Sequence, residues 1–208
     1  MHNKLIFIGT GGAFSKKNIN NSAYIKKNNH IILFDCGETV FHQILKTGII
    51  DQYTSRIDII ITHFHSDHVG SIGSLLFYCR FKKIKSINVI FPKKDVVVNY
   101  LKIIGISYDM YKFIYPKNLD YYLRPYVQEH GDIDSNKNII LMPAYGYHLK
   151  FYQYNIFYSG DTNVLNPDVL NKFKQGRIKY IYHDVSLPQI DGFKTHIELN
   201  ELEKLVLV

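Results

Sequence analysis

The feature that most constrains this chain is a dense histidine motif that directly follows an apolar run. Residues 57–61 predict a buried strand, and residues 62–70 then read Thr-His-Phe-His-Ser-Asp-His-Val-Gly. A sharp turn after the strand would aim these polar side chains into one pocket. Imidazole and carboxylate groups are ligands for Zn²⁺ and similar ions, and they would cost stability if they were buried unpaired. The motif therefore predicts a metal site, and the alternative is a surface loop that happens to be rich in histidine.

Length and composition indicate an ordinary soluble protein. The 208 residues suffice for one domain over residues 1–208, and the chain is 46% hydrophobic and 21% charged. No apolar stretch is long enough to span a bilayer, and the N-terminus does not resemble a secretory signal, so we expect a cytoplasmic protein without membrane contact. The two cysteines, Cys36 and Cys79, imply no disulfide framework. Buried free thiols are the favoured interpretation, ahead of metal ligands.

The net charge favours an anionic partner. The chain carries a formal charge of +7, and its isoelectric point is near 9.2. Its 17 tyrosines and 13 phenylalanines could stack on nucleobases, although most are expected in or near the core. Charge and aromatic content together give only modest support for a nucleotide or nucleic-acid substrate.

Strands and helices are predicted throughout the chain, which favours an α/β or α+β fold. The pattern predicts strands at residues 4–8, 23–25, 30–34, 57–61, 87–91, 139–142, 147–152, 156–158 and 180–182. It predicts helices at residues 39–45, 71–81, 95–104, 168–173 and 198–205. The tyrosine-rich residues 106–134 follow neither pattern clearly. No internal repeat, linker or domain boundary is evident.

Other polar residues follow predicted strands. Asp35 and Asp161 each come after an apolar strand and lie in a glycine-containing turn. Each could be a metal ligand, a partner that orients a histidine, or a turn residue, and the nearby histidine motif favours the first two roles. Four further histidines are candidate ligands: His130, His148, His183 and His196. His183 and His196 are better placed by sequence than His2, His30 and His42, which are assigned to the surface or core.

Taken together, the motifs resemble the metallo-β-lactamase superfamily and, within it, the ribonuclease Z-like branch. The resemblance covers nearly the whole chain and rests on residues 7–13, 21–23, 35–38, 62–70, 129–130, 145–147, 159–162 and 183–184. It implies an αββα sandwich of two mixed sheets, with or without its last strand, and a site for two metal ions.

The resemblance also implies a role for each site residue. His63, His65 and His130 would hold one metal, Asp67 and His68 would hold the other, Asp161 would bridge them, Asp35 would lie beneath the site, and Asp184 with His196 would help to protonate the leaving group. Two Zn²⁺ ions are expected, with Mn²⁺ as an alternative. A water shared between the ions would be acidified to hydroxide, and Asp67 could act on that attacking water.

The sequence departs from the pattern of the ribonuclease Z-like branch at three points. Residues 131–143 separate His130 from the segment at 145–147, which makes His148 a rival third histidine. The branch supplies a last ligand histidine after the helix that follows His196, and no such histidine occurs by Val208. Three explanations remain: His196 takes that role, the segment is lost, or the chain is a truncated member. There is also no glycine- and proline-rich arm of the kind that clamps transfer RNA.

The leading functional prediction is a two-metal phosphodiesterase that acts on cyclic nucleotides or RNA ends. Anti-Pycsar phosphodiesterases, which degrade cyclic pyrimidine nucleotides, resemble the chain in compactness and motif order. The alternatives are a hydrolase of lactone, thioester or β-lactam bonds, and a non-catalytic scaffold that binds metal or nucleotide. The resemblance also predicts a homodimer, with residues 106–126 as the interface or a substrate lid.

Overall fold

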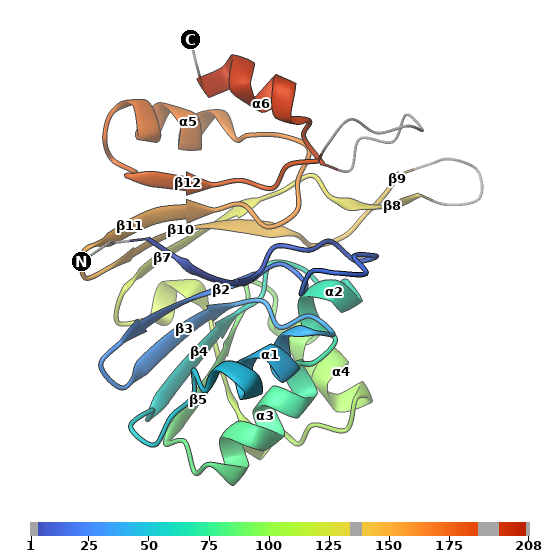
Figure 1. The fold of residues 1–208 in the computed structure, drawn as a ribbon, viewed down its shortest axis with the longest axis vertical. Coiled ribbons are helices and arrows are strands. Elements are labelled where there is room, and N and C mark those ends of the chain that lie inside the picture. Colours follow the sequence, from blue (N-terminus) through green and yellow to red (C-terminus); the bar gives the residue numbers. More distant parts are fainter. Residues whose placement is uncertain (1–3, 134–138, 187–195, 207–208) are drawn as a thin grey trace. The chain divides into compact units, whose positions relative to one another are not determined.

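The chain divides into two compact units. The structure, a computed structural model, describes residues 4–133, 139–186 and 196–206. The N-terminal unit comprises residues 5–119, and the C-terminal unit comprises Lys4 and the described residues from 120 onward. Each unit contains its own β-sheet and helices (Figure 1). The organisation of residues 1–208 as a single domain stays a prediction.

A mixed six-stranded sheet forms the centre of the N-terminal unit, counted over the described residues. In spatial order its strands are β1 (Ile6–Gly9), β2 (Ser22–Lys27), β3 (His30–Phe34), β4 (Arg56–Ile60), β5 (Ser86–Ile90) and β6 (Lys112–Ile114). The first three pair antiparallel, whereas β3 to β6 run parallel. The carboxyl ends of β3, β4 and β5 therefore lie at one edge, and the turns after them can place side chains in one region.

Helices connect the parallel strands of this unit, and Figure 1 shows α1, α3 and α4 along one side of the sheet. The helical segments are α1 (Val40–Thr47), α2 (Ser66–Val69), α3 (Ile72–Phe81), α4 (Lys94–Ile103), and the 3-10 turns η1 (Tyr108–Met110) and η2 (Pro116–Asn118). As predicted, α1 ends near Gly48, which adopts a left-handed φ of 64° and donates to the Ile44 carbonyl. The sequence pattern does not predict the short helix α2 as an element of its own.

The C-terminal unit contains a four-stranded sheet in the order β12-β11-β10-β7 and a separate two-stranded hairpin, among the residues described. Its elements are β7 (Tyr122–Val127), β8 (Gly131–Ile133), β9 (Ile139–Leu141), β10 (Tyr145–Phe151), β11 (Tyr154–Tyr158), α5 (Pro167–Lys174), β12 (Tyr180–Tyr182) and α6 (Leu199–Val206). Val169 of α5 packs in a buried cluster with Phe157 and Tyr126. This helix begins at Asn166, whose side chain accepts from two backbone N–H groups of the first turn.

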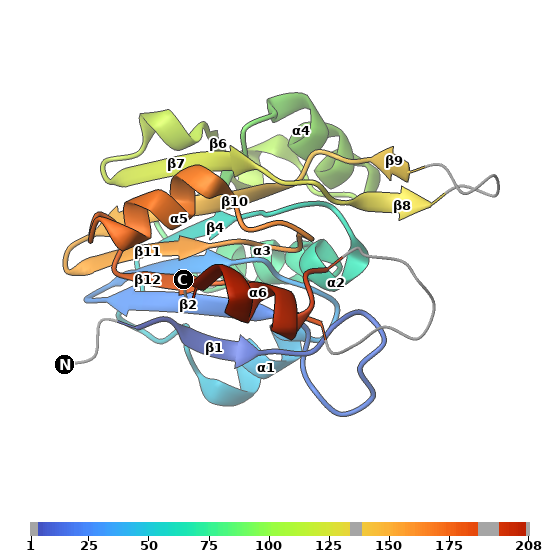
Figure 2. The same cartoon turned by 90° about the horizontal axis from the view of Figure 1, so that it is seen from above.

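The hairpin β8–β9 explains the residues that separate His130 from β10. Gln128 N donates to the Ala144 carbonyl (2.9 Å), and Met142 N donates to the His130 carbonyl (3.1 Å). Gly131 then pairs with Leu141. The ladder between β7 and β10 therefore continues into β8 and β9, which Figure 2 shows extending beyond the main sheet. The described part of the intervening segment consists of this strand pair, and His130 lies in the short link between β7 and β8, opposite Met142.

The structure confirms the mixed α/β class. Most predicted strands and helices are present within a few residues of the expected bounds, and the tyrosine-rich span contains η1, β6, η2, β7 and β8. The ambiguity of the sequence pattern in that span has a physical cause, since short strands such as β6 carry no complete pattern. None of the described helices has both the length and the apolar character needed to cross a membrane.

Candidate metal centre

The histidine motif lies at the carboxyl end of β4, as the sequence predicts. His63 is fully buried in the turn after the strand, and Asp67 and His68 lie in α2. Asp35 follows the neighbouring strand β3, and its N–H donates to the Ile60 carbonyl (3.0 Å). Adjacent parallel strands thus bring Asp35 next to the motif.

Asp35 orients His68 and the start of the motif. One carboxylate oxygen of Asp35 accepts from the Thr62 N–H (2.7 Å), and the other accepts from the Thr62 hydroxyl (2.8 Å) and from Nδ1 of His68 (2.9 Å). Burial raises the pKa of the Asp35 carboxyl, although these donors act in the opposite direction. An Nδ1–H bonded to a carboxylate leaves the His68 Nε2 lone pair available to a metal.

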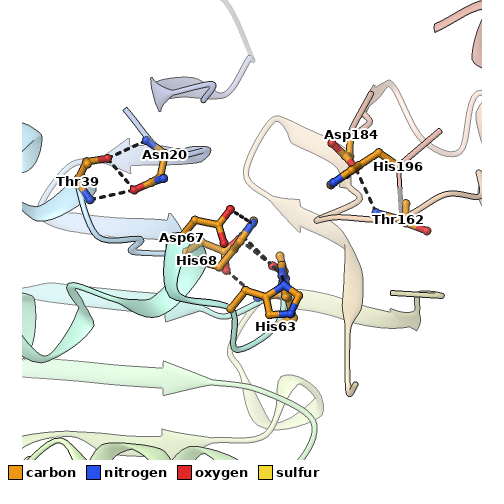
Figure 3. Close-up of polar contacts among 11 residues, drawn as sticks. Asn20, Thr39, His63, Asp67, His68, Thr162, Asp184 and His196 are labelled. Atoms are coloured by element: carbon orange, nitrogen blue, oxygen red, sulfur yellow. Dashed lines mark hydrogen bonds and ion pairs between the residues drawn. The ribbon is translucent and has the colours of Figure 1, made fainter. Parts of the chain in front are cut away.

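The imidazole rings of the motif are close together. Nε2 of His63 lies 3.1 Å from Nδ1 of His65, and the His63 and His68 ring centroids are 4.1 Å apart. Asp67 Oδ2 lies 3.5 Å from Nε2 of His68 (Figure 3). Three imidazoles and a carboxylate are the donors that a Zn²⁺ or Mn²⁺ ion prefers, so these residues fit a metal.

A close backbone approach fixes α2 against the segment after β3. Cys36 N donates to the His68 carbonyl (2.7 Å), and a Cβ built on Gly37 would lie 1.8 Å from the Asp67 carbonyl oxygen. Only glycine allows this approach. The Cys36 and Cys79 thiols are buried and unbridged, and burial raises the pKa of each to about 12. The prediction of buried free thiols is confirmed, and such thiols are inert near neutral pH.

In the C-terminal unit, Asp161, Asp184 and His196 form a second cluster. One potential ligand atom from each lies within 4.8 Å of the others. His196 Nδ1 donates to Asp184 Oδ2 (2.5 Å), and the same oxygen accepts from the Thr162 N–H at 3.3 Å (Figure 3). Asp161 follows β11 through Gly160, which adopts a left-handed φ of 61°. The cluster offers two carboxylates and one oriented imidazole.

The structure distinguishes the surroundings of the two rival histidines. The buried His130 ring lies 5.9 Å from the His196 ring. His148 instead donates through Nε2 to Asn155 Oδ1 (2.8 Å), and burial lowers the pKa of its ring. His183 donates through Nδ1 to the Asp184 carbonyl (2.6 Å). His130 and His148 therefore lie in different surroundings, and the choice of His130 over His148 as the third histidine ligand stays a prediction.

Comparisons with known proteins identify relatives of the chain. A sequence model described as Anti-Pycsar protein Apyc1 matches residues 3–102. The chain is 27% identical to an Anti-Pycsar protein Apyc1 from Paenibacillus xerothermodurans, over 94% of this chain and 79% of that protein. It is 32% identical to a ribonuclease Z from Methanocaldococcus jannaschii, over 89% of this chain but 61%, less than two thirds, of that protein's length. The metallo-β-lactamase fold protein YhfI from Bacillus subtilis superposes with a TM-score of 0.70, at 16% identity and 97% and 80% coverage of the two chains.

The chain has the metallo-β-lactamase fold, and its sequence is similar to proteins named Anti-Pycsar protein Apyc1 and ribonuclease Z. These relatives are metal-dependent hydrolases, and the predicted resemblance to the ribonuclease Z-like branch is confirmed. The fold prediction is likewise confirmed at the level of the metallo-β-lactamase fold.

The sequence pattern assigns no role to two hydroxyl residues near the candidate site. Thr62 supplies two donors to Asp35, and the Ser159 hydroxyl accepts from the Asp184 N–H (2.8 Å). Both lie directly beside a motif residue, at the end of a strand. Their place after a strand, next to a motif residue, is the feature of the sequence that could have indicated a role for them. The hydrogen-bond partners themselves, Asp35 and Asp184, are more than 20 residues away along the chain.

Proposed function

We propose that the chain is a two-metal phosphodiesterase that acts on nucleotides, either cyclic nucleotides or RNA ends. The observation that carries the proposal is the His63, His65, Asp67 and His68 cluster, with His68 oriented by the buried Asp35. Relatives named Anti-Pycsar protein Apyc1 and ribonuclease Z support a nucleotide or RNA substrate, and the charge of +7 favours an anionic one.

The proposed ligands follow the family resemblance. His63, His65 and His130 would hold one ion, Asp67 and His68 the other, and Asp161 would bridge them. Zn²⁺ is the proposed metal and Mn²⁺ the alternative, because imidazole and carboxylate ligands suit both. When bound, the ions would supply Lewis-acid polarisation of the phosphate and an activated water.

The side chains around these ligands would orient groups and move protons. Asp35 holds the proton on His68 Nδ1 and so keeps Nε2 directed at the ligand position. The Asp184 carboxylate holds the proton on His196 Nδ1 in the same way, and an imidazole held so can deliver a proton from Nε2 to a leaving oxygen. Asp67 is the proposed acceptor for a proton of the attacking water.

The test is hydrolysis of a panel of cyclic nucleotides and of bis(p-nitrophenyl) phosphate by protein loaded with Zn²⁺ or Mn²⁺. We expect turnover that His63→Ala reduces by more than the about 10- to 100-fold that loss of a residue orienting a metal ligand costs. Metal analysis by mass spectrometry should find two ions per chain. Faster cleavage of a lactone or thioester would favour the acyl-bond alternative. Absence of all turnover in protein shown to carry metal would favour a non-catalytic scaffold.

Two further predictions concern the protein in the cell. The homodimer and the cytoplasmic location stay predictions that rest on the family resemblance and the composition. Light scattering on a gel-filtration column measures the mass directly, and a mass near 24.3 kDa would contradict the dimer.

A further inference from the structure

The loop at residues 10–19, between β1 and β2, holds an aromatic side chain out in solvent. The Phe14 side chain is 97% exposed, more than any other large hydrophobic residue among those described. The loop is nevertheless ordered by internal bonds, because Ser15 N donates to the Gly12 carbonyl (3.1 Å) and Asn18 N donates to the Ser15 hydroxyl (3.0 Å). A single exposed apolar residue is common, so the position and the charge of this loop carry the argument for a ligand at Phe14.

The base of this loop is anchored beside the histidine motif. Asn20 and Thr39 form a reciprocal clasp: Asn20 N donates to the Thr39 hydroxyl (2.8 Å), and Thr39 N donates to Asn20 Oδ1 at 2.9 Å (Figure 3). A Cβ on Gly37 would meet both Asn20 Cβ, at 2.9 Å, and the Asp67 carbonyl oxygen. Gly37 thus lies directly between the loop base and the metal motif. Figures 1 and 2 agree that the loop lies at the same end of the sheet as α2.

The charge of the loop indicates which kind of ligand could bind at Phe14. Lys16 and Lys17 follow Phe14 closely, and both are exposed. No acidic residue occurs in the sequence before Asp35. An exposed aromatic ring next to two exposed lysines suits a nucleotide, because the base stacks on the ring and the phosphate is attracted by the ammonium groups. A second copy of this basic loop would instead be repelled.

We propose that Phe14 is a stacking platform for the nucleobase of the substrate, with Lys16 and Lys17 attracting its phosphate. This inference rests on the proposed function and narrows it. The preferred substrate carries a base, and a phosphodiester without a base lacks the stacking contact. Phe14 would therefore determine specificity, while the metal ligands carry the chemistry.

Fluorescence gives a direct test, because the sequence contains no tryptophan. Phe14→Trp introduces a single indole at the proposed platform. Phe81→Trp is the matched control, since Phe81 is 79% exposed and ends α3, about 15 Å along that helix from its start near the motif. We expect saturable quenching of the Phe14→Trp indole by nucleoside monophosphates and by cyclic nucleotides. Glycerol phosphate should leave it unchanged. Equal quenching of both variants, or none in Phe14→Trp, would overturn the inference.

Kinetics give the second test and separate the inference from the proposed function. Phe14→Ala should raise KM for cyclic nucleotides by about 10-fold, the effect of losing one stacked base. Phe14→Tyr should restore the wild-type value, and Phe14→Leu should not. Hydrolysis of glycerol 1,2-cyclic phosphate should be unaffected by all three. Turnover of nucleotides by wild type with no Phe14 effect would overturn the inference alone, as would a change in molecular mass in Phe14→Ala. Absence of any turnover by wild type would overturn the proposed function, and the quenching result would still stand.

Discussion

At the residue scale, a buried carboxylate determines which nitrogen of His68 faces the ligand position. Asp35 has a positive φ of 60°, which is uncommon for a residue with a side chain but is tolerated by aspartate and asparagine. Three donors from Thr62 and His68 hold it there. Position 35 therefore needs a residue that tolerates a positive φ and whose side chain accepts these hydrogen bonds. A substitution can keep the first property and remove the second.

Asp35→Asn is the substitution that tests the orientation of His68. Asparagine keeps the backbone conformation but can place an N–H₂ donor where the carboxylate accepts a hydrogen bond from His68 Nδ1. His68 would then accept at Nδ1 and carry its proton on Nε2, which cannot bind a metal in that form. We expect Zn²⁺ affinity to fall about 10- to 100-fold, measured by competition with a chromogenic chelator. An unchanged affinity in a folded variant would show that Asp35 does not set the tautomer.

A second prediction at the residue scale concerns the stability of a Gly37 variant. Its missing side chain allows the backbone to pass the Asp67 carbonyl, so Gly37→Ala should force apart α2 and the segment after β3. We expect a loss of about 1–3 kcal/mol in the free energy of unfolding, measured by urea denaturation. Gly12→Ala is the matched control, because a Cβ there meets nothing within 4 Å. Equal effects at the two positions would contradict this explanation.

At the scale of elements, a buried ionic cluster centred on Asp58, the middle residue of β4, links three neighbouring strands. Asp58 of β4 is fully buried and accepts from His30 of β3 (3.0 Å), Asn88 of β5 (2.6 Å) and Arg56 (2.8 Å). Burial alone would raise the pKa of Asp58, but these three donors outweigh it and lower the pKa to about 2. The cluster satisfies a charge that would otherwise be costly within an apolar strand.

This lowered pKa predicts how stability depends on pH. The folded-state pKa of Asp58 lies below the ordinary value of 3.8, so its contribution is present above about pH 4 and is lost as the pH falls toward 2. The difference corresponds to about 2 kcal/mol. Urea unfolding between pH 5 and pH 2 should show this loss in the wild type and a smaller one in Asp58→Asn. Parallel pH profiles for the two proteins would contradict the assignment.

At the scale of the whole molecule, the proposed ligands come from both compact units. His63, His65, Asp67 and His68 belong to the N-terminal unit, whereas His130 and Asp161 belong to the C-terminal unit. A metal that binds only the folded chain stabilises it by mass action. Under the proposed function, that stabilisation extends to both units.

Metal addition tests this directly. Free Zn²⁺ at 100 times its Kd should stabilise the protein by about 2.7 kcal/mol, and so raise Tm by roughly 5–10 °C. Hydrogen exchange should slow in β4 and also in β11, one strand from each unit. His63→Ala should abolish the protection in both strands. Protection confined to the N-terminal unit would contradict the ligand roles proposed for His130 and Asp161.

Local pattern by itself determines much of this protein. The apolar run before His63, the spacing of His63, His65, Asp67 and His68, and the glycine after α1 are features of neighbouring residues, so the sequence alone displays them. The ribonuclease Z-like resemblance follows from such local motifs. Short strands such as β6 and β8 escape prediction, because three residues carry no periodicity.

The tertiary structure decided what depends on partners distant in sequence. Asp35 is hydrogen-bonded to Thr62 and His68. Strands β8 and β9 continue the β7–β10 ladder between His130 and β10. The His130 ring lies near His196, whereas His148 bonds to Asn155. A clasp between Asn20 and Thr39 anchors the loop that exposes Phe14. The sequence determines which groups are available and in what local order. Their hydrogen-bond partners and burial depend on which strands become neighbours, and strand pairing joins residues that are far apart along the chain.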